Sequence, residues 1–192
     1  MFAKVIGVVG SPRHSKNTGT LVQKVLEGVK SKGIETALFY ISDYQISPCK
    51  ACDACKQSGE CVQDDDMKIL HSAMREAKGL VLGTPIYLDH VSAQTKVFLD
   101  RLYSYLGPNL EHRFPNGVKS VLVFSWGASS PDAYNNVIAW LQGRLSGYFD
   151  IETIEVIKAA RTDTVSVSKE EDLLRKAFDT GVRLSDFLKR RS

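Results

Sequence analysis

Short apolar runs alternate with amphipathic stretches along nearly the whole 192-residue chain. The first run, residues 3–9, is continuous and rich in β-branched side chains, which is typical of a strand covered on both faces. Residues 17–31 then place apolar side chains at helical spacing. Further strands are expected at 36–41, 79–83, 118–126 and 151–158, and further helices at 67–78, 92–106, 131–145 and from 168 onward. Five strands alternating with five helices predict an α/β fold: a doubly wound, five-stranded parallel sheet with helices on both faces.

Length and composition favour one domain spanning residues 1–192, because a chain with 43% hydrophobic residues can fill one core. The formal charge of +3 is too small to indicate nucleic-acid binding, and it suits anionic small molecules or acidic partners. No run approaches the roughly 20 apolar residues of a membrane span, and residues 1–15 lack the layout of a signal peptide. We therefore expect a cytoplasmic protein that is not bound to a membrane.

All four cysteines lie in the segment 48–62, at Cys49, Cys52, Cys55 and Cys61. Their spacing is C-x2-C-x2-C-x5-C, and its first part matches the opening of the bacterial ferredoxin motif. One short loop is therefore able to supply all ligands of a [4Fe-4S] cluster. A zinc site, which usually joins two C-x2-C units across a longer spacer, is one alternative, and thiol or disulfide chemistry is the other. A reducing compartment favours a metal over a disulfide framework.

The loops after the first and third strands are where a ligand is expected, because a ligand of an open α/β sheet lies where the strand order reverses, and in the flavodoxin-like order that point is between those two strands. The first loop lacks both the Walker A and the G-x-G-x-x-G pattern. It is nevertheless dense in polar and cationic side chains and leads into a helix N-terminus, where free amides favour phosphate. These candidates for a phosphate monoester site are Ser11, Arg13, Ser15, Lys16, Asn17 and Thr18. The alternative is a solvated loop with an ordinary helix cap.

The loop expected after the third strand contains Thr84, Pro85, Ile86 and Tyr87. A rigid proline, an apolar residue and an aromatic residue at one end of a sheet suit the face of a flat ring, although they also suit an ordinary turn at the end of a strand. Trp126 and Gly127, after the fourth strand, are candidates for completing the ring pocket, while a core position explains Trp126 equally well.

Four smaller predictions concern an acidic run, a histidine, the start of the last helix and a pair of tyrosines. The acidic run 64–66 is expected to begin the following helix rather than to bind a metal. His71 is expected on the surface of that helix, and Ser168 with Glu171 is expected to form a capping box at the start of the last helix. Tyr103 and Tyr105 suggest either a contact between subunits or an internal core.

Three segments together carry a family resemblance: GSPRHSKNT after the first strand, PCKACDACKQSGECVQDDDM after the second, and GTPIYLDHVSAQTKVFLDR after the third. They resemble the iron–sulfur flavoproteins, in the NADPH-dependent FMN reductase group of the flavodoxin-like fold. The resemblance implies FMN at the two loops and a [4Fe-4S] cluster on the four cysteines. It also implies ferredoxin or NAD(P)H as electron donor, a small-molecule acceptor and a homodimer or homotetramer. No catalytic side chain is expected.

Two other functions are compatible with the same residues. The first is an NAD(P)H-dependent FMN or quinone reductase without a loaded cluster, in which the cysteines are structural or sense redox state. The second is a metal-stabilised module that binds a phosphorylated ligand at residues 10–18 without catalysis.

Overall fold

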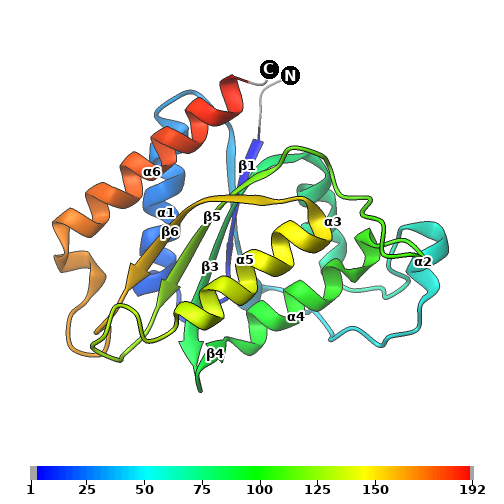
Figure 1. Ribbon diagram of the computed structural model, residues 1–192, viewed down its shortest axis with the longest axis horizontal. Coiled ribbons are helices and arrows are strands. Elements are labelled where there is room, and N and C mark those ends of the chain that lie inside the picture. The colour runs from blue at the N-terminus through cyan, green and yellow to red at the C-terminus, as the bar shows by residue number, and fades with distance from the viewer. Residues whose placement is uncertain (1–3, 191–192) are drawn as a thin grey trace.

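Five parallel strands form one sheet in the order β2-β1-β3-β5-β6 in the computed structural model, which describes residues 4–190 (Figure 1). The strands are β1 (Lys4–Val9), β2 (Thr36–Tyr40), β3 (Ala77–Tyr87), β5 (Lys119–Ser125) and β6 (Glu152–Ala159). The chain passes from β1 to one neighbour and then crosses to β3 on the other side, so the strand order reverses between β1 and β3. The predicted flavodoxin-like parallel sheet is confirmed. Residue 3, where the first strand is predicted to begin, lies outside the described residues.

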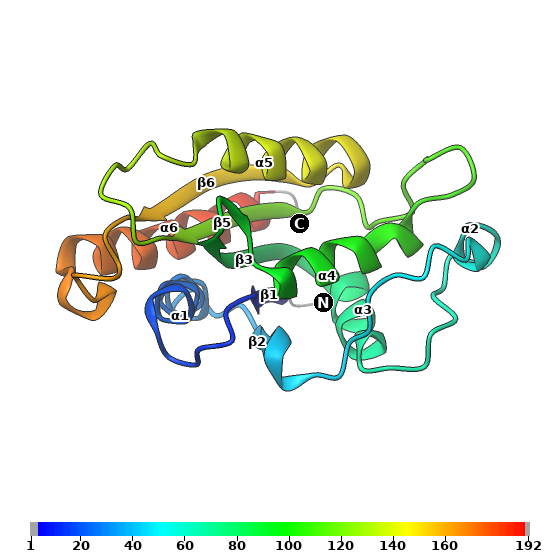
Figure 2. The same ribbon diagram turned by 90° about the horizontal axis from the view of Figure 1, so that it is seen from below.

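Helices cover both faces of the sheet, as the alternation of elements requires. On one face lie α1 (Asn17–Lys30) and α6 (Glu171–Lys189); on the other lie α3 (Met67–Glu76), α4 (Ala93–Arg101) and α5 (Asn135–Phe149) (Figure 1 and Figure 2). The two layers bury separate apolar clusters. The helices α1 and α6 approach closely at Gly28 and Gly181, where a Cβ atom would lie 2.0 Å and 1.9 Å from a backbone oxygen of the other helix.

The third strand is longer than the sequence indicates. Residues 84–87, predicted to be a loop, belong to β3, which continues for 11 residues and pairs antiparallel with β4 (His90–Val91). Leu88 and Asp89 make the turn between them with positive φ angles of 45° and 62°. The tight turn folds the chain back on itself, so Ile86 and Tyr87 pair with Val91 and His90. The predicted count of five strands is therefore one short.

Several helix boundaries also differ from the prediction: α3 ends at Glu76 instead of residue 78, and α5 extends to Phe149 instead of residue 145. The helix α4 ends at Arg101 and continues as a 3₁₀ turn at Leu102–Tyr105, while α5 begins only at Asn135. The predicted capping box at Ser168 and Glu171 is wrong, because Val167–Lys169 forms a 3₁₀ turn of its own ahead of α6. That turn is fixed by a long-range contact, in which the buried Val167 donates its backbone N–H to Asn17 Oδ1 at 3.0 Å.

The cysteine segment leaves the sheet after β2 and lies to one side of it, where it contains the short helix α2 (Ala54–Ser58) (Figure 1). Arg113 Nη2 donates to the carbonyl of Lys56 at 2.7 Å, and the Lys56 ammonium lies 5.7 Å from the centre of the Tyr103 ring. The segment is thus held beside the 3₁₀ turn that follows α4. Among residues 4–190 no helix is long and apolar enough to cross a bilayer.

Candidate functional site

A cavity of about 240 Å³ opens at the carboxyl ends of the parallel strands. The loop after β1 contributes Ser11, Arg13, Lys16, Asn17 and Thr18 to its lining. The other predicted residues in the lining are Pro85, Ile86, Tyr87, Trp126 and Gly127. The structure therefore brings ten of the twelve predicted cofactor residues to one cavity. The other two, Ser15 and Thr84, are not part of its lining.

The loop after β1 is built onto the N-terminal end of α4. Ser92 Oγ donates to the carbonyl of Gly10 at 2.6 Å, and a Cβ atom at Gly10 would lie 1.8 Å from Thr95 Oγ1. Ser11 Oγ then accepts the backbone N–H of Arg13 at 3.1 Å. Only a residue without a side chain fits at position 10, so the loop closes tightly against α4 and its polar residues face the cavity.

Asn17 and Thr18 line the cavity and also form hydrogen bonds that hold neighbouring elements together. The Asn17 side chain donates from Nδ2 to the carbonyl of Thr162 at 3.1 Å and accepts from Val167, so it links the loops after β1 and β6. Thr18 Oγ1 and Ser125 Oγ lie 2.6 Å apart in a buried hydrogen bond between α1 and β5. These contacts fix where α1 begins relative to the sheet.

The N-terminus of α1 presents favourable electrostatics for an anion. Lys16 is the N-cap residue and makes no side-chain cap, which leaves the first backbone amides without that partner. Arg13 and Lys16 are both exposed at the cavity, and within residues 4–190 neither forms an ion pair. Two cations and a helix N-terminus at one side of the cavity fit a phosphate group.

The opposite side of the cavity is largely apolar. Ile86 is buried and Tyr87 half-exposed at the end of β3. Trp126 is 3% exposed, donates from Nε1 to the carbonyl of Ser130 at 3.1 Å and packs edge-on against Tyr134. It is therefore both a core residue and part of the cavity wall. Thr84 is buried, and its hydroxyl accepts the backbone N–H of Ser92, so it supports the β3–β4 hairpin.

Three lining residues were not identified from the sequence: Ser125, Thr162 and Asp163. The sequence does contain a signal for them. All three lie at the carboxyl ends of β5 and β6, and ligands of an open α/β sheet lie beyond the carboxyl ends of its strands, as was assumed for β1 and β3. Asp163 brings a carboxylate to the Gly127 side of the cavity, 3.3 Å from where a Gly127 Cβ would lie. The cavity thus has one acidic group among its cations.

The four cysteines occupy different environments within their segment. Cys55 is buried, Cys61 is partly exposed, and Cys49 and Cys52 are exposed. Burial raises the pKa of the Cys55 thiol, and the nearby Cys61, Cys49 and Cys52 sulfurs raise it further. Four thiols around one centre are the donor set that an iron–sulfur cluster uses. Among the described residues, however, no three His, Cys, Asp or Glu side chains are arranged to hold a metal ion.

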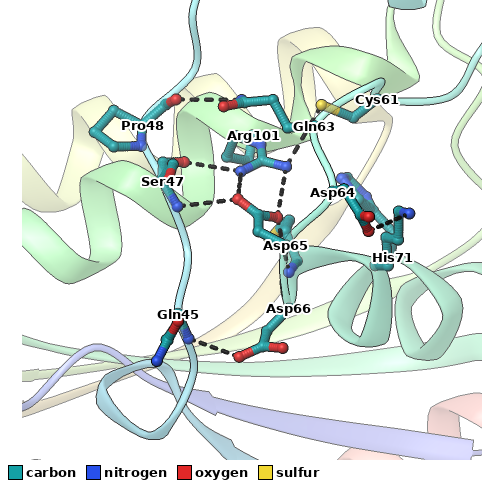
Figure 3. Close-up of polar contacts among 12 residues, drawn as sticks. Gln45, Ser47, Pro48, Cys61, Gln63, Asp64, Asp65, Asp66, His71 and Arg101 are labelled. Atoms are coloured by element: carbon teal, nitrogen blue, oxygen red, sulfur yellow. Dashed lines mark hydrogen bonds and ion pairs between the residues drawn. The ribbon is translucent and has the colours of Figure 1, made fainter.

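Hydrogen bonds join the two ends of the cysteine segment at its base (Figure 3). They run from Gln45 N to Asp66 Oδ2 (2.7 Å), from Ser47 N to Asp65 Oδ2 (3.0 Å) and from Gln63 Nε2 to the carbonyl of Pro48 (3.2 Å). The residues before and after the cysteines are therefore paired side by side, and the cysteines lie on the loop between them.

The acidic run does more than begin a helix. Asp65 accepts the backbone N–H of Met67 at 3.1 Å, as expected for a helix start, but Asp66 at the N-cap makes no side-chain cap. Burial raises the pKa of Asp65, yet hydrogen bonds from Arg101, Ser47 and Met67 outweigh it, and the net pKa is lower than usual. This ion pair could not be predicted from the sequence, because Arg101 lies 36 residues from Asp65.

One prediction near this segment is wrong, and for Tyr105 the structure decides between the two alternatives. His71 was expected on the surface of its helix but is only 7% exposed and packs edge-on against Tyr105, with ring centres 5.3 Å apart. Tyr105 is itself core, at 3% exposure, so it offers no surface to another subunit. Both rings lie in the helical layer on the α3 and α4 side of the sheet. The spacing of apolar residues along a helix does not show which of its polar residues a neighbouring element covers.

The sequence profile of the NADPH-dependent FMN reductase family matches residues 3–156. The chain belongs to this family. Within it, the chain is 43% identical over 98 residues to an iron–sulfur flavoprotein of Methanocaldococcus jannaschii, and 40% identical over 98 residues to one of Methanosarcina thermophila. Each match covers 51% of this chain and 51% of the relative. The chain thus spans about half the length of these relatives, and the resemblance to iron–sulfur flavoproteins is confirmed over that part.

Solved structures agree with this assignment at the level of fold. An NAD(P)H:quinone oxidoreductase from Methanothermobacter marburgensis superimposes with a TM-score of 0.72 at 16% identity, over 96% of this chain and 98% of that protein. An archaeal flavodoxin superimposes with a TM-score of 0.60 at 15% identity, over 97% and 99%. At these identities the comparison shows a shared FMN reductase and flavodoxin architecture.

In this FMN reductase fold the loop after β1, which lines the cavity, and the cysteine segment contact opposite ends of α4. Ser92, at its N-terminal end, contacts the loop after β1, and Arg101, its last residue, contacts Ser47 and Cys61. A nine-residue helix is about 14 Å long. The two candidate sites are therefore separated by the length of this helix and do not adjoin.

Proposed function

We propose that the chain is an FMN-binding oxidoreductase whose cysteine segment carries a [4Fe-4S] cluster and which passes electrons to a small-molecule acceptor. The observation that carries the proposal is the cavity at the carboxyl edge of the sheet. It combines the N-terminus of α1 and two cations that form no ion pair among the described residues with a largely apolar wall, as a phosphorylated cofactor with a planar ring requires.

The phosphate of FMN would lie against the first turn of α1, held by Ser11, Arg13 and the backbone amides that follow Lys16. The ring would lie against Pro85, Tyr87 and Trp126, which line the cavity. Asn17 and Thr18 fix the position of these two sides relative to each other through their hydrogen bonds with Thr162 and Ser125. Ser15 and Thr84, though predicted for the same role, would act on the cofactor only through the loop and hairpin they belong to. When bound, FMN supplies electron-transfer chemistry, and the protein positions it.

The four thiolates of Cys49, Cys52, Cys55 and Cys61 would be the cluster ligands. Cys55 lies innermost, and the other three sulfurs are near enough to raise its pKa. Two relatives that bear the name iron–sulfur flavoprotein match this chain over about half their length, which supports the cluster. We propose ferredoxin as the electron donor to that cluster. A protein of this type is expected in the cytoplasm, with no membrane or nucleic acid as partner.

We further propose that the functional unit is a homodimer or homotetramer. Within one chain, the cysteine segment lies away from the cavity by about the length of α4, so a second copy would bring a cluster nearer to a flavin. A largely apolar groove of about 300 Å³ between α4 and α5 is lined by Leu99, Tyr103, Trp140 and Tyr148 and offers a contact surface. Analytical ultracentrifugation tests this part: a monomer at every concentration would contradict it.

Anaerobic purification followed by a visible spectrum, with iron and acid-labile sulfide assays, tests the main proposal. We expect flavin absorbance together with a broad cluster band and four irons for each chain, as the cluster type requires. A colourless protein after FMN addition would overturn the flavin site. A yellow protein whose iron stays below one per chain after reconstitution would remove the cluster and leave the flavin.

The arrangement of the sulfurs favours one alternative, an NAD(P)H-dependent FMN or quinone reductase without a loaded cluster. No three metal-binding side chains converge among the described residues, and two of the cysteines are exposed. The rates of flavin reduction by NADPH and by reduced ferredoxin separate the two functions. In the alternative, NADPH reduces the flavin at the same rate in the wild type and in a Cys55→Ser variant.

A further inference from the structure

We propose that Arg101 is the positioning residue of the cysteine segment: it closes the base of the segment and presents a fixed positive charge to the sulfur of Cys61. This inference rests on the proposed cluster site for its electrostatic part. Its structural part concerns the chain alone.

Arg101 is the last residue of α4, and its side chain reaches both ends of the segment at once (Figure 3). Nη1 donates to the carbonyl of Ser47 at 2.8 Å and to Asp65 Oδ2 at 2.6 Å. Nη2 donates to Asp65 Oδ1 at 3.0 Å and to Cys61 Sγ at 3.4 Å. Since Ser47 precedes the cysteines and Asp65 follows them, one guanidinium ties the entry of the segment to its exit.

The ion pair of Arg101 and Asp65 is more deeply buried than the other ion pairs of the segment. Arg101 is 2% exposed, whereas Arg75 and Glu60, which pair at 3.3 Å beside Cys61, have side chains 48% and 69% exposed. A fork of two hydrogen bonds from arginine to a carboxylate fixes geometry as well as charge, and lysine has no such fork. A buried ion pair is by itself weak evidence for stability, because desolvation offsets the attraction. The pair is therefore better explained by what it holds in place.

The contact with Cys61 has a defined electrostatic sign. A buried cation next to a sulfur ligand stabilises the more negative, reduced state of a cluster, and hydrogen bonds to the sulfurs are one determinant of cluster potential. Asp65 acts in the opposite direction on the same sulfur, because its carboxylate lies on the far side of the guanidinium. Removing one member of the pair thus leaves the other uncompensated beside Cys61.

Substitution of Arg101 and substitution of Asp65 are therefore expected to shift the cluster potential in opposite directions. A purely structural role of the pair does not predict opposite shifts. In the loaded protein, Arg101→Gln shifts the cluster midpoint potential to more negative values, and Asp65→Asn shifts it to more positive values. Arg101→Lys keeps the charge but not the fork, so its potential stays closer to that of the wild type. An EPR-monitored redox titration measures all three, and Arg175→Gln, whose exposed partner Asp172 lies on α6, serves as the control with an unchanged potential.

Hydrogen–deuterium exchange of the iron-free protein tests the structural part. Amides of residues 45–66 should exchange at least several-fold faster in Arg101→Gln, Arg101→Lys and Asp65→Asn than in the wild type. In Arg175→Gln their exchange should not change. FMN affinity checks the overall fold, because the cavity lies at the other end of α4. If Arg101→Gln does not fold, Arg101→Lys and Asp65→Asn carry the same test.

The results that overturn the proposal are specific. Unchanged exchange of residues 45–66 in these variants would show that Arg101 does not close the segment. Potentials that shift in the same direction in Arg101→Gln and Asp65→Asn would remove its charge role. If the wild type itself takes up no iron, the proposed cluster fails, while the exchange measurements still decide whether Arg101 positions the segment.

Discussion

Protonation of His71 should account for a large part of the acid sensitivity of this protein. The imidazole lies on α3 at 7% exposure, with its ring edge-on to Tyr105. Burial lowers its pKa, and the positive charges of Arg101 and Arg75 lower it further, from 6.5 to about 4. His71 is therefore neutral in the folded protein at pH 7, and acid must force a charge into the core.

The magnitude follows from the two pKa values. A depression from 6.5 to about 4 corresponds to about 3 kcal/mol, at roughly 1.4 kcal/mol for each unit of pKa. Above pH 6.5 the imidazole is neutral in both the folded and the unfolded chain, so it costs nothing. As the pH falls from 6.5 to about 4, the unfolded chain takes up the proton and the folded chain does not. The free energy of unfolding therefore decreases across that window and levels off below it.

The substitution that tests this is His71→Phe, measured by denaturant unfolding of iron-free protein between pH 4 and pH 8. Phenylalanine keeps a ring against Tyr105, and Ser104 retains its hydrogen bond to the carbonyl of Arg101 at 3.3 Å. We expect the wild type to lose about 3 kcal/mol more stability on acidification than the variant. Asp65, whose pKa is lowered, also costs stability in acid, but it is present in both proteins and cancels in the difference.

A matched control is His112→Gln, which removes an exposed histidine and should retain the pH dependence of the wild type. Parallel curves of unfolding free energy against pH for the wild type and His71→Phe would refute the reasoning. That result would mean that the core admits the imidazolium without penalty, and that burial near two arginines does not control this titration.

The remaining predictions concern the helix contact, the cavity and the cysteines. Gly181→Ala should destabilise the fold by about 1–3 kcal/mol in thermal or denaturant unfolding, because the new Cβ would lie 1.9 Å from the carbonyl oxygen of Val25. Gly143→Ala, which meets nothing within 4 Å, should instead be neutral or stabilising by up to about 1 kcal/mol, and equal losses in both would contradict the packing argument. Arg13→Ala should weaken FMN binding by about 1–3 kcal/mol in fluorescence titration, and unchanged affinity would place the phosphate elsewhere. Cys55→Ser should lose iron and keep FMN, whereas retained iron would exclude Cys55 as a ligand.

The sequence alone determined the architecture and the main elements of the cavity. Apolar β-branched runs alternating with amphipathic helices leave few arrangements other than a parallel sheet covered on both faces, and its switch point dictates which loops meet. Ten predicted residues accordingly line one cavity. The cysteine spacing is equally local, since one short segment holds all four thiols. These features can be predicted from the sequence because the spacing of residues along the chain determines their relative positions.

Only the tertiary structure decided the contacts between residues distant in sequence. Nothing local shows that Val167 pairs with Asn17, that His71 is covered by a neighbouring element, or that the cysteine segment lies beside α4 instead of adjoining the cavity. Arg101 is the clearest case: its position on a helix predicts a charge at the surface, but the fold buries it between Ser47, Asp65 and Cys61. The physical reason is that burial and ion pairing depend on what packs against a residue, and periodicity describes only the element to which that residue belongs.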